Sequence, residues 1–72
     1  MQHFSYYEIY TIMLVKTRCT GMYYTLERAK ESLAEKAAKG RPDGKGDIYR
    51  IDLTVDENLE VQMTQKRVFS TD

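Results

Sequence analysis

The sequence predicts a small α+β domain in which one helix packs on a three-stranded sheet, in the order β-α-β-β. Residues 4–17 are rich in Tyr and β-branched residues and contain no Gly or Pro, which favours a strand. Residues 25–39 are almost all strong helix formers. Residues 48–69 form two further candidate strands around Asp56-Glu57-Asn58, a hairpin signal. A chain of 72 residues allows one domain, 1–72.

The first predicted strand, residues 4–17, has two usable faces. If the two later strands are neighbours in a hairpin, this strand can join only at a sheet edge, and a long apolar edge is a template for pairing with another chain. We therefore expect it to bind a partner protein, a second copy of the chain, or both. The alternative is that the chain's own termini cover it. The protein-binding candidates on its second face are Tyr6, Tyr10, Ile12 and Leu14.

The helix predicted over residues 25–39 has clear boundaries. Thr25 is placed to cap the first turn, and Gly40 followed by Pro42 ends the helix. One narrow stripe should face the sheet, and it consists of Leu26, Ala29, Leu33 and Ala37. The following segment 40–46, GRPDGKG, lacks the spacing and the strand-to-helix context of a phosphate loop, so we expect a flexible connection.

The hairpin is expected to pair residues 48–55 with residues 59–69. A three-residue loop usually needs a left-handed conformation at its last position, which Asn58 tolerates well. The resulting register places apolar pairs on one face and polar pairs on the other. The apolar pairs are Val55 with Leu59, Leu53 with Val61, and Ile51 with Met63.

Charge and cysteine content limit the classes of function. Eleven Lys and Arg against eleven Asp and Glu give zero formal net charge, which argues against a dedicated nucleic-acid binder. A local basic and aromatic patch remains the alternative, and its members would be Lys16, Arg18, Tyr23 and Tyr24. A single cysteine and the absence of a long apolar run favour a cytoplasmic protein that does not cross a membrane.

Few residues are suited to catalysis or metal binding. His3 and Cys19 are the strongest base and nucleophile, but they lie sixteen positions apart across one predicted strand, so we expect no dyad. Cys and His do not cluster as metal ligands, and the acidic residues are scattered. We therefore expect no enzyme activity, no metal and no cofactor.

The order of these elements is similar to that of a known group of small proteins. A strand, then a helix opening Thr25-Leu26-Glu27-Arg28-Ala29-Lys30, then a hairpin beginning Ile48-Tyr49-Arg50-Ile51 resembles small phage-encoded β-α-β-β accessory proteins. These include anti-CRISPR proteins and inhibitors of host RNA polymerase. The resemblance implies a non-enzymatic protein that binds a larger host complex and occludes a site on it.

Overall fold

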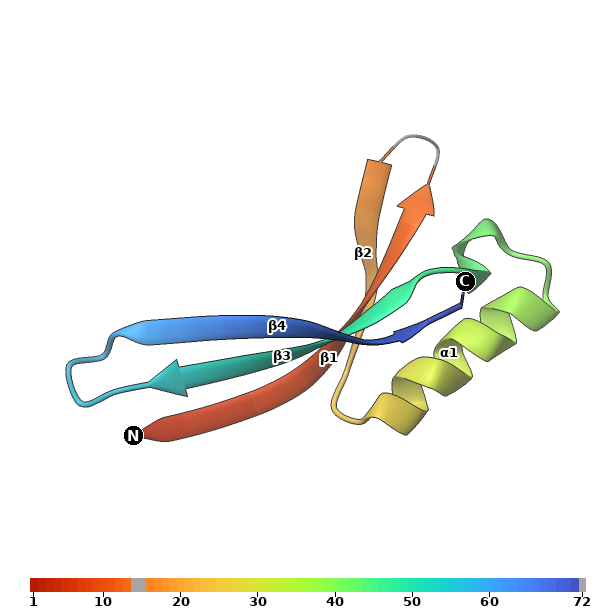
Figure 1. Cartoon of the computed structure of the whole chain (residues 1–72). Coiled ribbons are helices and arrows are strands. Elements are labelled where there is room, and N and C mark those ends of the chain that lie inside the picture. Colours follow the sequence, from red (N-terminus) through yellow and green to blue (C-terminus); the bar gives the residue numbers. More distant parts are fainter. Residues whose placement is uncertain (14–15, 72) are drawn as a thin grey trace.

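The computed structural model describes residues 1–13 and 16–71, which form one helix and four strands. The strands are β1 (Gln2–Met13), β2 (Lys16–Tyr23), β3 (Asp47–Val55) and β4 (Val61–Ser70), and the helix is α1 (Leu26–Ala38). All neighbouring strands are antiparallel, in the order β2-β1-β3-β4 (Figure 1). The predicted α+β class with one helix is confirmed, whereas the prediction of three strands in the order β-α-β-β is wrong.

The predicted first strand is in fact two strands. β1 ends at Met13, and β2 begins at Lys16 and runs back along β1. β1 also pairs with β3 on its other side, so it is a central strand, and the predicted edge position is wrong. The physical reason is that a hairpin partner inside the chain already satisfies the backbone groups expected to be free. No Gly, Pro, Asn or Asp occurs near residues 13–16 to signal the end of one strand and the start of the next.

Helix α1 covers one part of one sheet face. Thr25 caps it as predicted, because its Oγ1 accepts a hydrogen bond from the Arg28 amide at 3.2 Å. Ala29 and Leu33 are buried against Ile9 of β1 and Ile48 of β3, which are direct cross-strand partners. These four residues form the centre of the core.

The connection after α1 is ordered, contrary to expectation. Gly40 ends the helix with a φ of 69°, as its position predicted. The segment Pro42–Gly44 then forms a short 3₁₀ helix against α1. Asp43 is 8% exposed and accepts hydrogen bonds from the Arg41 guanidinium at 3.0 and 3.1 Å, with the Lys36 amine 3.9 Å away. Buried ion pairing therefore fixes a segment whose composition suggested flexibility.

The β3–β4 hairpin differs from the predicted register by two residues. Asp56 and Glu60 flank the loop, and the Asp56 carboxylate accepts hydrogen bonds from the Asn58 amide at 2.8 Å and the Glu60 amide at 3.0 Å. The pairs are now Val55 with Val61, Leu53 with Met63, and Ile51 with Gln65. A shift of two residues keeps every side chain on its predicted face. The left-handed residue is Leu59 (φ 62°), not Asn58.

The sheet extends well beyond the helix. The N-terminal half of β1 and the β3–β4 turn project together to the left in Figure 1, away from α1. β2 pairs with β1 only from Tyr7 onward, so this projection has three strands. We call it the arm, defined as residues 2–6, 51–55 and 61–65.

Replacing Leu59 by Gly should stabilise the domain by about 0.5–1 kcal/mol, because glycine adopts positive φ without the steric cost that Leu pays. Leu59 is 81% exposed, so little packing is lost. Thermal unfolding followed by circular dichroism should show a rise in Tm of several degrees. Asn58→Gly is the matched control and should give no such gain, since Asn58 does not have a positive φ. A lower Tm for Leu59→Gly would contradict the assigned turn.

Candidate functional site

The sheet face opposite α1, which we call the helix-free face, is apolar along the arm. β1 contributes Phe4 and Tyr6, and their cross-strand partners on β3 are Leu53 and Ile51. Ile51 is 0% exposed although it does not belong to the core cluster under the helix, so its neighbours on this face bury it. The remaining apolar side chains of the face are Val55, Val61 and Met63.

Several side chains of this face are open to solvent. Phe4 is 53% exposed, Val61 is 62% exposed and Met63 is 61% exposed. Further along the same face, Ile12 is 72% exposed. Met22, the cross-strand partner of Glu8 on β2, is 62% exposed. Contiguous exposed apolar side chains on a small domain are typical of a protein-binding surface.

The helix-side face of the arm is polar and internally paired. Asp52 accepts hydrogen bonds from the Ser5 hydroxyl at 2.6 Å and the Arg50 guanidinium at 3.3 Å, and the His3 Nε2 lies 3.2 Å from the same oxygen. The Ser5 hydrogen bond is the main reason why the pKa of Asp52 lies below its usual value. The arm therefore has one polar face, with a hydrogen-bonded group centred on Asp52, and one apolar face.

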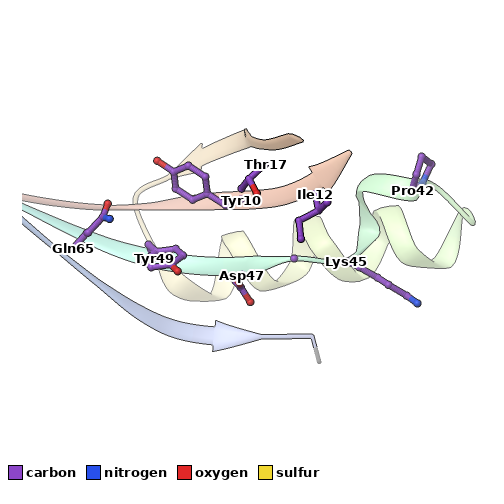
Figure 2. Close-up of a pocket in the computed structure, with 9 residues that line it drawn as sticks. Tyr10, Ile12, Thr17, Pro42, Lys45, Asp47, Tyr49 and Gln65 are labelled. Atoms are coloured by element: carbon purple, nitrogen blue, oxygen red, sulfur yellow. The ribbon is translucent and has the colours of Figure 1, made fainter. Parts of the chain in front are cut away.

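An open hollow of about 540 Å³ continues the helix-free face toward the helical end of the sheet. The rings of Tyr10 and Tyr49 meet edge to face there, with centroids 5.5 Å apart. Figure 2 shows these rings with Ile12, Gln65 and Asp47, while the helix lies behind the strands. Such a hollow, mostly apolar with a few polar groups, can accept a side chain from a bound protein.

Glu8 lies next to Tyr10, which lines the hollow. Its carboxylate accepts a hydrogen bond from the Tyr10 hydroxyl at 3.0 Å, and the Cys19 thiol lies 3.8 Å from its second oxygen. The hydrogen bond to Glu8, with burial next in size, raises the pKa of Tyr10 to about 12. Burial chiefly raises the pKa of Tyr6 as well. Both tyrosines therefore stay protonated to a higher pH than an ordinary tyrosine does.

The predicted protein-binding residues are now placed. Tyr6, Tyr10 and Ile12 all lie on the helix-free face, because Ile9 and Thr11, between them in sequence, are buried on the helix side. Leu14 lies outside the described residues. Sequence reasoning did not single out Phe4, Leu53, Val61 or Met63 for binding. The alternation of the hairpin does put the last three on one face, but nothing in it shows which face the helix leaves open.

The residues of the predicted basic and aromatic patch do not come together. Lys16 and Tyr23 are the first and last residues of β2, so they are separated by about 23 Å of extended chain. Tyr23 packs against the core and its hydroxyl donates a hydrogen bond to Ser32 at 2.7 Å, so its ring is not free to stack on a base. Tyr24 is 90% exposed at the start of the helix, away from Lys16 and Arg18.

The Ser5, Asp52 and His3 side chains lie close together, but they are not arranged as in a catalytic triad. In a catalytic triad, histidine stands between the hydroxyl and the carboxylate. Here the Asp52 carboxylate stands between Ser5 and His3, so the imidazole does not receive the serine proton. Cys19 lies on β2 opposite Tyr10, which is seven residues along β1 from His3. No group of three or more metal-binding side chains occurs among residues 1–13 and 16–71.

Comparison with known proteins gives no relative to extend this description. No family model, curated protein or solved structure matches the chain. Within the part of the chain that the structure describes, no helix is long and apolar enough to span a membrane. The exposed surface of the domain is therefore the guide to its function.

The Glu8–Tyr10 hydrogen bond should make stability fall at high pH. Because the folded pKa of Tyr10 lies above its ordinary value of 10, the stabilisation is fully present below pH 10 and is lost as pH rises through about 12. Tyrosinate absorbance at 295 nm should show a late-titrating component that Tyr10→Phe removes. Glu8→Gln should shift that component to lower pH, whereas Asp52→Asn, on the other face, should leave it in place. An unchanged titration in Glu8→Gln would contradict the assignment.

Proposed function

We propose that the chain is a small non-enzymatic protein–protein interaction module that binds a larger protein through its helix-free face. The observation that supports this proposal most directly is the exposure of Phe4, Val61 and Met63 on one side of a projecting arm whose other side is polar. A monomeric domain rarely leaves such a patch in contact with water. The fold supplies a twisted sheet whose helix-free face is open along its length (Figure 1).

The hollow beside the arm supplies an anchor point for this mode of binding. Interface energy usually concentrates in a few large side chains that enter pockets near the centre of a contact. Tyr10, Tyr49 and Ile12 line the hollow, and the apolar arm continues from it along β1 and β3. A partner that inserts one apolar side chain into the hollow can lay further apolar residues along the arm.

The physiological role that fits this mode is stoichiometric occlusion. A domain of 72 residues that binds without catalysis can act by covering a site on a larger complex. We propose a cytoplasmic inhibitor encoded by a phage or mobile element, of the anti-CRISPR or polymerase-inhibitor type. The small size of the domain and its exposed apolar face support this part of the proposal, whereas the observed β-β-α-β-β order differs from the β-α-β-β order of the proteins it resembles. We do not propose nucleic-acid binding as the function, because the structure separates its candidate residues.

The proposed surface can be tested with one substitution on each side of the molecule. Phe4→Ser should weaken binding to the protein retained by the immobilised wild-type chain by at least about tenfold, as measured by surface plasmon resonance. Tyr24→Ser is the matched control, because Tyr24 is also an exposed aromatic residue but lies at the helix N-terminus. It should bind as the wild type does. Equal binding by both variants would remove the arm from the interface.

A further inference from the structure

The outer edge of β4 offers a second interaction surface, distinct from the helix-free face. β4 is the last strand in the sheet order of the described residues. The opposite edge, β2, carries Lys16 and Arg18 and is interrupted by a bulge opposite Ile9 and Tyr10, features that discourage pairing. The stretch Val61–Gln65 of β4 has no charge, no proline and no bulge. It therefore remains competent to pair with another strand.

The direction of the free backbone groups on β4 follows from the hairpin turn. The Asp56 amide donates to the Glu60 carbonyl at 3.1 Å, so these two residues form a hydrogen-bonded pair. Hydrogen-bonded and non-hydrogen-bonded pairs alternate along an antiparallel ladder. The N–H and C=O groups of Val61, Met63 and Gln65 therefore point away from β3, toward the open edge.

We propose that a second copy of this chain pairs with β4 around a two-fold axis at Met63, which joins two sheets into one of eight strands. In this arrangement Met63 lies opposite Met63 of the second copy, and Val61 lies opposite Gln65. The outward groups then form about six inter-chain hydrogen bonds. A two-fold axis perpendicular to the sheet keeps both helix-free faces on the same side.

Charge complementarity selects this partner and this register. Centring the axis on Met63 places Glu60 of each copy opposite Lys66 of the other, on the polar side of the sheet. Within the described part of the chain neither side chain forms an ion pair, so both are available. Centring the axis on Thr64 instead places Lys66 opposite Gln62, and centring it on Gln62 places Lys66 opposite Asn58. Only the Met63 register pairs opposite charges directly across the two strands.

The resulting dimer would enlarge the surface described above. In each copy the arm projects away from α1 (Figure 1). The two arms would therefore lie at the centre of the joined sheet, and the helices would lie at its two ends on the opposite face. The apolar residues of both arms then form one continuous face. The dimer does not require that this face bind a partner, so the two proposals can be tested separately.

A charge-reversal cycle tests the dimer. The oligomeric state is measured by sedimentation equilibrium over a wide range of protein concentration, and wild-type protein should dimerise. Glu60→Lys and Lys66→Glu should each raise the dimer dissociation constant by about tenfold, because each places two like-charged pairs across the axis. The double variant should restore it to within about threefold of wild type. A wild-type monomer at every concentration, or a double variant as weak as the single ones, overturns the proposal.

A proline substitution tests the edge itself. Met63→Pro removes an amide hydrogen that points outward, so it should abolish the dimer while circular dichroism shows a folded chain. Thr64→Pro is the control, because its amide points toward β3 and its loss should disrupt the hairpin. Phe4→Ser should leave the dimer intact. A dimer that survives Met63→Pro but is lost in Phe4→Ser would place self-association on the helix-free face and overturn the edge model.

Discussion

The pairing of β1 on both of its sides is the constraint on which the rest of the molecule depends. Ile9 lies in one row with Gly21 of β2 and Ile48 of β3, and the helix packs its Leu33 and Ala29 onto that row. Because alternate residues of a strand point to opposite faces, fixing Ile9 toward the helix also fixes Tyr6, Tyr10 and Ile12 away from it. The core and the candidate binding surface are therefore two sides of one strand.

The length of α1 explains why it leaves the arm uncovered. A helix of 13 residues is about 20 Å long, whereas the molecule extends 46 Å along its longest axis. One helix can therefore cover less than half of a sheet of this length. Beyond the helix, the side chains of the strands either pair with one another or remain exposed. On the helix side, polar side chains form hydrogen bonds to Asp52, and on the other side Phe4 and Met63 are exposed.

Local chemistry in the sequence predicted local structure well. Thr25 and Gly40 set the helix ends, since a side-chain cap and a left-handed glycine act within a few residues. The strand count was missed because no Gly, Pro, Asn or Asp lies between the end of β1 at Met13 and the start of β2 at Lys16. The hairpin register was missed because the Asp56 carboxylate organises the loop one residue later than expected. Alternation separated the two faces of the arm, but only the packing of the helix shows which face is free.

The sheet order also has a consequence for how the chain folds. The β1–β2 and β3–β4 hairpins are local and can form within microseconds, but the contact that joins them links Gln2 with Val55 and Ile9 with Ile48. Closing a loop of that length costs chain entropy. The compensating packing energy is gained only once β1 has paired with β3. We therefore expect formation of the β1–β3 ladder to be the slow step of folding. In this step the β1–β2 hairpin docks onto the β3–β4 hairpin.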